Sequence, residues 1–279
     1  MAKQAGKAQT GPLAIIGGGN IGTGIARGLV ASGGYEPGNI IVTRRNVALL
    51  AGLAEQGFQV QADNEGAVDA AGAVIIAVQP QQLDKVLSQI ASRLRSRDQV
   101  LISVVSGVRV AELQERIGAD VPVVRAMPNT AIEIGESMTC LAAAPAHAAA
   151  LAFAEKLFGL VGRTLVINEN LMAGATALGG CGIAFFLRSI RAASQGGIEI
   201  GFHPEEALLM AAQTARGASA LALRDRSHPE SEIDKVTTPR GATIAGLNQM
   251  EHEGFSSAFI KGIVTSAEKV AQLYHGEQG

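Results

Sequence analysis

The sequence predicts an α/β protein, in which an N-terminal, mainly parallel sheet is followed by an all-helical C-terminal domain. Three observations predict this class: short apolar runs alternate with helical patterns, a glycine-rich turn follows the first run, and no strand pattern occurs after about residue 168. The 279 residues, 47% of them hydrophobic and 17% charged, are enough for two domains with a sizeable core. We expect the domains to span 12–168 and 169–279, after a flexible N-terminus of residues 1–11.

Seven apolar runs are expected to form strands, because each is short and most are bounded by turn residues. They cover residues 13–16, 40–43, 73–78, 100–105, 121–127, 138–143 and 163–167. Helical patterns lie between them, at 21–31, 47–56, 83–94 and 110–117, and an Ala-rich helix precedes the last strand. Strands that alternate with helices in this way favour parallel pairing through right-handed crossovers.

The C-terminal part shows only helical patterns, at 183–201, 205–223, 241–253 and 256–274. Two His-Pro-Glu triplets, beginning at His203 and His228, are typical of helix starts with proline in the first turn. These helices are rich in Ala, Gly and Ser, so their backbones can approach closely. They either bury an apolar face against a dimer partner or form an ordinary packed helical domain.

The glycine-rich turn after the first strand fits the dinucleotide fingerprint of Rossmann-like domains, and it reads Gly17-Gly18-Gly19-Asn20-Ile21-Gly22. Gly17 permits a tight turn, Gly19 lets the backbone approach a diphosphate, and Gly22 lets the following helix pack against the strand. The N-terminus of that helix offers free N–H groups to phosphate. The alternative is a glycine-rich turn that binds no ligand.

An arginine pair, Arg44 and Arg45, follows the second expected strand. NAD-specific proteins usually carry an acidic residue near this point, which binds the ribose 2′-hydroxyl. Two guanidinium groups can instead clasp a 2′-phosphate in bidentate fashion. We therefore expect NADPH as the cofactor, with NADH bound more weakly; the alternative is that both arginines are solvated loop charges.

The composition argues against several other classes of protein. The net charge of −2 shows no basic excess, so we expect no nucleic-acid partner. The two cysteines and five histidines follow no disulfide or metal-ligand spacing, so we expect reduced thiols and no metal. The N-terminus lacks an apolar signal core, and no uninterrupted apolar run is long enough for a convincing membrane span. We therefore expect a cytoplasmic protein without a membrane partner.

Four segments, taken in order and at their spacing, resemble pyrroline-5-carboxylate reductases over nearly the whole chain. They are Ile16-Gly17-Gly18-Gly19-Asn20-Ile21-Gly22, Ala77-Val78-Gln79-Pro80, Arg125-Ala126-Met127-Pro128-Asn129-Thr130 and Pro239-Arg240-Gly241-Ala242-Thr243-Ile244. The resemblance implies a Rossmann domain, a helical dimerisation domain and often a ring of dimers. It also implies NADPH-dependent reduction of 1-pyrroline-5-carboxylate, a small anionic cyclic imino acid, to L-proline in proline biosynthesis.

The resemblance also implies roles for single residues. Thr243 would be the catalytic residue, hydrogen-bonding the imine nitrogen and relaying its proton. The substrate carboxylate would be bound by backbone N–H groups of the loop, and the expected substrate-binding residues are Thr238, Arg240, Gly241, Ala242, Thr243, Met127, Asn129 and Cys181. Asn64 would approach the adenosine half of the cofactor, which would also be lined by Ala77, Val78, Gln79 and Pro80. From the residues alone, Thr238-Pro239 is more simply a helix cap.

The sequence departs from the family pattern at four places. Gln79 stands where the family usually has lysine, Arg240 where it has glycine, and Arg226 where an acidic residue is common. The fourth is the small-residue segment 179–185, which contains Cys181. Two hypotheses follow: Arg240 contacts the substrate carboxylate directly, or the substrate is another cyclic imino acid.

Three alternative functions remain open from the sequence. A related reductase would act on a substituted or six-membered cyclic imino acid. A β-hydroxyacid dehydrogenase would need a lysine general acid, but Lys235 and Lys261 lack the expected surrounding pattern. A non-catalytic nucleotide sensor would bind NADPH without oxidising it.

Overall fold

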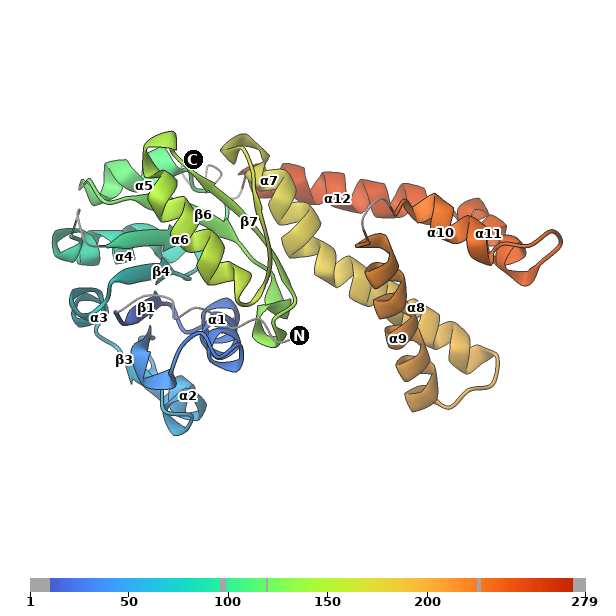
Figure 1. Ribbon diagram of the computed structural model, residues 1–279, viewed down its shortest axis with the longest axis horizontal. Helices are drawn as coiled ribbons and strands as arrows, with labels where there is room; N and C mark the ends of the chain where they lie inside the picture. Colours follow the sequence, from blue (N-terminus) through green and yellow to red (C-terminus); the bar gives the residue numbers. More distant parts are fainter. Residues whose placement is uncertain (1–10, 96–98, 119, 225–226, 273–279) are drawn as a thin grey trace. The chain divides into compact units, whose positions relative to one another are not determined.

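The computed structural model describes residues 11–95, 99–118, 120–224 and 227–272 (Figure 1). The chain divides into two compact units, which are described separately: Met1–Cys181 with Ser266–Gly279, and Gly182–Thr265. The predicted domain limits at 12–168 and 169–279 stay a prediction. The predicted flexible segment before Gly11, and Arg226, lie outside the described residues.

The first unit is built on one sheet, whose eight strands within the described ranges follow the order β3-β2-β1-β4-β5-β6-β7-β8. β6 and β7 pair antiparallel, and every other neighbouring pair is parallel. The predicted fold class, a mainly parallel sheet followed by helices, is thereby confirmed. The strands are β1 Leu13–Ile16, β2 Ile40–Thr43, β3 Gln59–Gln61, β4 Ala73–Ile76, β5 Val100–Ser103, β6 Val123–Met127, β7 Ser137–Ala143 and β8 Gly162–Val166.

The register of the central strands brings three important loops to one edge of the sheet. Ile16, the last residue of β1, lies opposite Thr43 in β2 and Ile76 in β4. Because these strands are parallel, the chain leaves all three at the same edge, where open α/β sheets bind their ligands. The glycine turn, the arginine pair and the segment 77–80 therefore emerge side by side.

Helices cover both faces of this sheet (Figure 1). The α-helices are α1 Asn20–Ala31, α2 Ala51–Glu55, α3 Asn64–Ala70, α4 Leu83–Ile90, α5 Val110–Ile117, α6 Ala148–Gly159 and α7 Met172–Ala175. The 3₁₀ turns are η1 Pro37–Asn39, η2 Val47–Leu50, η3 Pro80–Gln82, η4 Ala91–Arg93, η5 Thr130–Ile134, η6 Pro145–His147 and η7 Glu169–Leu171. A π-helix, η8 Thr176–Cys181, follows α7.

The hydrophobic core has two layers, because side chains alternate across each strand. Leu13 and Ile15 of β1 join the layer that contains α1, α2 and α6. Ala14 and Ile16 face the opposite layer, which contains α3, α4 and α5. All four side chains of β1 are at most 1% exposed, as expected of a central strand covered on both faces.

The structure differs from several predicted elements. β3 and α3 were not predicted, because β3 has only three residues, two of them glutamines, and lies at the sheet edge. The predicted helix 47–56 is divided into η2 and the short α2. The strand predicted at 73–78 ends at Ile76, since the chain turns into the loop before Pro80.

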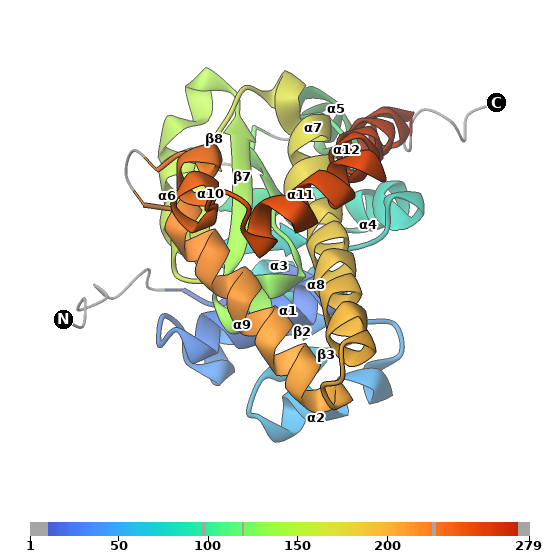
Figure 2. The same ribbon diagram turned by 90° about the vertical axis from the view of Figure 1, so that its right-hand side faces the viewer.

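The described residues of the second unit form only helices and the turns between them, as predicted. Its elements are α8 Gly182–Glu199, α9 Pro204–Ala222, α10 Pro229–Val236, α11 Ala242–His252 and the start of α12 Phe255–Gln272, which continues into residues of the first unit. α8 and α9 form a hairpin (Figure 2). A Cβ added at Gly197 would lie 3.0 Å from the Cβ of Ala207, so a small residue is needed where the two helices meet.

The helices of this unit expose large apolar side chains, among them Phe186, Leu187, Leu208 and Leu209. In the described part of the chain, the continuous run Glu169–Glu199 is also long and apolar enough to cross a membrane, with a mean hydropathy of 1.5 and 22% of its window buried. The prediction of no membrane span thus has one exception by length and composition. A single such helix is weak evidence, because exposed apolar faces also form subunit contacts.

Candidate functional site

The glycine turn after β1 has the geometry that its sequence predicts. Gly17 has a φ of 115°, which favours glycine. The N–H groups of Gly17 and Gly18 donate to the carbonyl oxygen of Thr43 at 3.2 and 2.8 Å, which ties the turn to β2. A Cβ at Gly22 would overlap the carbonyl oxygen of Gly17. A side chain is therefore excluded at Gly22 by the packing of α1 on the turn, and at Gly17 by its φ and by the backbone of Ala77.

The N-terminus of α1 is open. The helix begins at Asn20, which Ile21 follows, with Gly19 as its N-cap, and no side chain caps its first turn. A Cβ at Gly19 would meet no atom within 4 Å. The first N–H groups of a helix lack partners within the helix and carry partial positive charge. This end of α1 can therefore bind a phosphate group.

The arginine pair lies directly beside the glycine turn. Arg44 is half-buried, and its Nη1 donates to the carbonyl oxygen of Gly18 at 2.7 Å. Arg45 is exposed and lines the same cavity. The description of both as solvated loop charges is therefore wrong for Arg44, which is bound to the turn.

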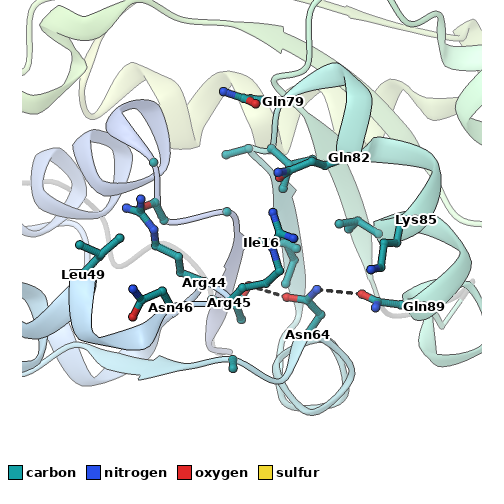
Figure 3. Close-up of a pocket in the computed structure, with 18 of the residues that line it drawn as sticks. Ile16, Arg44, Arg45, Asn46, Leu49, Asn64, Gln79, Gln82, Lys85 and Gln89 are labelled. Atoms are coloured by element: carbon teal, nitrogen blue, oxygen red, sulfur yellow. Dashed lines mark hydrogen bonds between the residues drawn. The ribbon is translucent and has the colours of Figure 1, made fainter.

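Asn64 is held in place from two sides. Its Oδ1 accepts a hydrogen bond from Thr43 Oγ1 at 2.6 Å, and its Nδ2 donates to Gln89 Oε1 at 3.1 Å (Figure 3). This chain of contacts links the end of β2 to α3 and α4. Asn64 thus lies close to the arginine pair; its approach to the adenosine half of a dinucleotide stays a prediction.

These residues surround a cavity of about 910 Å³ at the carboxyl edge of the sheet. It is lined by Ile16, Gly17, Gly18, Gly19, Thr43, Arg44, Arg45, Asn46, Leu49, Ala62, Asn64, Ala77, Val78, Gln79, Gln81, Gln82, Lys85, Val86 and Gln89. Most of the predicted cofactor residues are brought together here. Asn20, Ile21, Gly22 and Pro80 are not among the lining residues.

One wall of the cavity was missed in the sequence. Gln82, Lys85 and Gln89 line it from the start and body of α4. Their spacing of three and four residues places them on one face of a helix. The amphipathic pattern at 83–94 contained a signal for this wall, because the polar face of such a helix must lie away from the core.

The charges of this cavity fit NADPH. Three of its lining side chains are cationic, Arg44, Arg45 and Lys85, and none of the lining residues is Asp or Glu. NADPH carries a diphosphate and a 2′-phosphate, whereas the usual recognition of NAD needs a carboxylate beside the ribose. The residues present therefore suit a cofactor that carries the additional phosphate.

The segment after β6 is built around Asn129. Its Oδ1 accepts from the N–H of Ala131 at 3.1 Å, and its Nδ2 donates to the carbonyl oxygen of Gly179 at 3.0 Å. Asn129 thus connects this loop to the π-helix, which ends at Cys181; such helices are rare and are frequent at functional sites. Met127 is buried at the end of β6. None of these three predicted substrate residues lines the cavity described above.

An ion pair between the buried Arg125 and the partly exposed Glu169, not predicted from the sequence, also lies near this segment. Arg125 Nη1 contacts Glu169 Oε1 at 3.1 Å, and the same oxygen accepts from the N–H of Val110 at 2.7 Å. Burial lowers the pKa of the Arg125 guanidinium, while the hydrogen bond and charge of Glu169 oppose that shift. The pair ties β6 and the start of α5 to the chain that enters α7.

The two cysteines are free thiols. Cys140 is buried in β7, and burial raises the pKa of its thiol. Cys181 is only partly buried. No three His, Cys, Asp or Glu side chains lie close enough to hold a metal ion in the described part of the chain.

The predicted substrate loop lies in the second unit and opens α11. The N–H of Gly241 donates to the carbonyl oxygen of Thr238 at 2.9 Å, which closes a turn with Pro239 in its second position. Arg240, in the third position, has a φ of 59°, and no other non-glycine residue in the described ranges has a positive φ. Glycine is favoured at this position of such a turn.

The same turn leaves the first N–H groups of α11 free. The N-cap is Gly241, no side chain caps the helix, and α11 begins at Ala242. Interpreting Thr238-Pro239 as a simple cap is therefore wrong, because Thr238 precedes the N-cap by three residues. Ala242 and Thr243 have no carbonyl partner within the helix, so their N–H groups can bind an anion.

Two family models match the chain. One, described as pyrroline-5-carboxylate reductase dimerisation, matches residues 169–273. The other, described as NADP oxidoreductase coenzyme F420-dependent, matches residues 12–107. The first covers the helical part of the chain, and the second covers the strands and loops that form most of the cavity.

Similar proteins extend over nearly the whole chain. Pyrroline-5-carboxylate reductase 1 of Dictyostelium discoideum is 49% identical over 278 residues, which cover 95% of this chain and 50% of that protein. Pyrroline-5-carboxylate reductase 2 of the same organism is 49% identical over 273 residues, covering 92% and 91%. The chain thus spans half the length of the first relative and most of the second. A crystal structure of Plasmodium falciparum pyrroline carboxylate reductase with NADP bound shares the fold, with a TM-score of 0.85, 22% identity and coverage of 96% and 99%.

Proposed function

The chain belongs to the pyrroline-5-carboxylate reductase family, and we propose that it reduces the cyclic imine 1-pyrroline-5-carboxylate to L-proline with NADPH, in proline biosynthesis. The observation that carries this proposal is a cavity with three cations and no carboxylate at the glycine turn, on a chain 49% identical to such reductases. When bound, NADPH supplies a hydride to the imine carbon. The chain's own residues must then bind the cofactor and the imino acid and deliver one proton to the imine nitrogen.

The first unit supplies the cofactor side of the reaction. The backbone at Gly17–Gly19 and the open N-terminus of α1 hold the diphosphate. Arg45 is free to pair with the 2′-phosphate, while Arg44 also keeps the turn in shape through its bond to Gly18. These contacts favour NADPH over NADH.

The second unit supplies the substrate side. The N–H groups of Ala242 and Thr243 bind the carboxylate at the start of α11, where the helix dipole favours negative charge. The Thr243 hydroxyl hydrogen-bonds the imine nitrogen and relays its proton; its high intrinsic pKa suits relay and orientation better than the role of a strong acid. Arg240 adds a charge-assisted contact to the carboxylate.

The helical part of the chain forms a homodimer. The dimerisation family model at 169–273 supports this assembly, as do the exposed apolar side chains of α8 and α9. We further propose that the dimers join into a ring. We also propose that the protein acts in the cytoplasm. Light scattering that shows only monomers at micromolar concentration would contradict the assembly.

The test of the function is the rate of NADPH oxidation with 1-pyrroline-5-carboxylate, with its six-membered homologue and with no substrate. We expect oxidation that requires an imino acid and is fastest with the five-membered ring. A Thr243→Val variant should lower kcat by about a hundredfold, because proton-transfer groups commonly contribute at least that much. The matched control, Thr164→Val on β8, should keep wild-type rates. Preference for the six-membered ring would indicate the related reductase, and binding without oxidation would indicate a sensor.

A further inference from the structure

α4 has two faces with different partners. Leu83, Leu87 and Ile90 are buried in the core layer below the sheet. Gln82, just before the helix, and Lys85 line the cavity, together with Gln89 one turn later. This polar face is short and carries one charge, that of Lys85.

The charge of Lys85 is not neutralised by its surroundings. Its ammonium group forms no hydrogen bond or ion pair with any described residue. The neighbouring carboxylate, Asp84, is paired instead with Arg116, whose Nε lies 2.8 Å from its Oδ1. Since no Asp or Glu lines the cavity, Lys85 adds positive charge to the field there.

Lys85 faces the arginine pair across the cavity. Figure 3 shows Arg44 and Arg45 on one side, and Asn64, Lys85 and Gln89 on the other. Arg44 already donates one N–H to Gly18, whereas the side chains of Arg45 and Lys85 donate to no described residue. Asn64, fixed by Thr43 and Gln89, lies on the same wall as Lys85.

We propose that Lys85 is a specificity-determining residue, whose ammonium group binds the 2′-phosphate of NADPH from the wall opposite Arg45. A phosphate monoester carries close to two negative charges at neutral pH, which two cations from opposite walls can match. The diphosphate has its own donors in the glycine turn and at the N-terminus of α1. The inference rests on the proposed function only in taking NADPH as the ligand.

The test compares Lys85→Gln with Lys156→Gln, which removes another exposed lysine, on α6 and outside the cavity. Fluorescence titration of the full chain should show the Kd for NADPH rising about tenfold in Lys85→Gln, as expected for one charge-assisted contact. The Kd for NADH should not change. Competition by 2′,5′-ADP should weaken in parallel with NADPH, while competition by 5′-AMP should not. Lys156→Gln should leave all four affinities unchanged, and Lys85→Arg should restore most of the NADPH affinity.

Two results would overturn the inference. Unchanged NADPH affinity in Lys85→Gln would show that the ammonium group does not reach the cofactor. Equal losses of affinity for NADPH and NADH would show that Lys85 contacts the diphosphate, or that it acts only through the overall positive potential of the cavity. The proposed function fails separately. If the wild-type protein oxidises no NADPH with any imino acid, the proposed reaction is refuted. If Lys85→Gln nevertheless loses the preference for NADPH over NADH, the role of Lys85 is supported.

Discussion

Replacing Arg240 by glycine separates a conformational cost from a binding contribution. Arg240 occupies the third position of the turn Thr238–Gly241 with a φ of 59°, in the left-handed region that favours glycine. It also stands where the substrate loop needs to hold a carboxylate. An arginine kept in an unfavourable backbone conformation at such a place is explained if its side chain binds substrate.

The two effects have opposite signs. A side chain in the left-handed region costs about 1–2 kcal/mol, and Arg240→Gly removes that cost. Glycine also gives the unfolded chain more freedom, which takes back about 0.4–1 kcal/mol. The net gain in unfolding free energy is thus about 0–1.6 kcal/mol. Loss of a charge-assisted contact worth about 1.5–3 kcal/mol should raise KM for the imino acid by at least about tenfold.

The assay is urea unfolding at one fixed protein concentration, together with steady-state kinetics on the same samples. Arg240→Asn is the control, since asparagine tolerates the left-handed region but carries no charge. It should raise KM as glycine does, whereas Arg240→Lys should keep much of the affinity. A more stable Arg240→Gly variant with unchanged KM would refute the substrate contact. A less stable one would refute the argument from strain.

Three further changes test other parts of the structure. Glu169→Ala leaves the buried Arg125 without its partner, so urea unfolding should show a loss of about 3 kcal/mol, and Glu169→Gln a smaller loss; equal stability of all three proteins would contradict the pair's importance. Gly22→Ala places a Cβ on the carbonyl oxygen of Gly17, so NADPH titration should show at least about tenfold weaker binding; wild-type affinity would refute the close packing of the turn. Burial raises the pKa of Cys140, which keeps its thiol protonated to higher pH. Iodoacetamide at pH 8 should therefore modify the partly buried Cys181 first, and Cys140 only as the pH rises. Peptide mass spectrometry that found Cys140 modified first would contradict this order.

The sequence predicted the sheet well because its central strands are buried on both faces. Leu13–Ile16 and Ile40–Thr43 are continuous apolar runs, and the structure places both with the predicted limits. β3 escaped prediction because a three-residue edge strand with two glutamines has too little pattern to distinguish it from a loop. Local pattern therefore predicts the centre of this sheet and not its edge.

The candidate site was predictable where one contiguous motif carries it. The glycine turn and Arg44 are examples, since each was predicted from its place directly after an expected strand, although Arg44 contacts Gly18 from 26 residues away. The pair Arg125–Glu169 could not be predicted, because its members lie 44 residues apart and their contact depends on the fold. The place of Lys85 needed both the sequence and the fold. Helix periodicity places it on the polar face of α4, and only the sheet register shows that this face lines the cavity.

The most direct measurement of the proposed reaction follows the hydride itself. The full chain is incubated with NADPH carrying deuterium at the transferred position and with 1-pyrroline-5-carboxylate, and the product is examined by mass spectrometry. We predict L-proline with one deuterium at C5, formed in equal amount to the NADPH oxidised, and formed much more slowly when NADH replaces NADPH. Cofactor oxidation that leaves proline unlabelled, or binding of NADPH without any product, would contradict it.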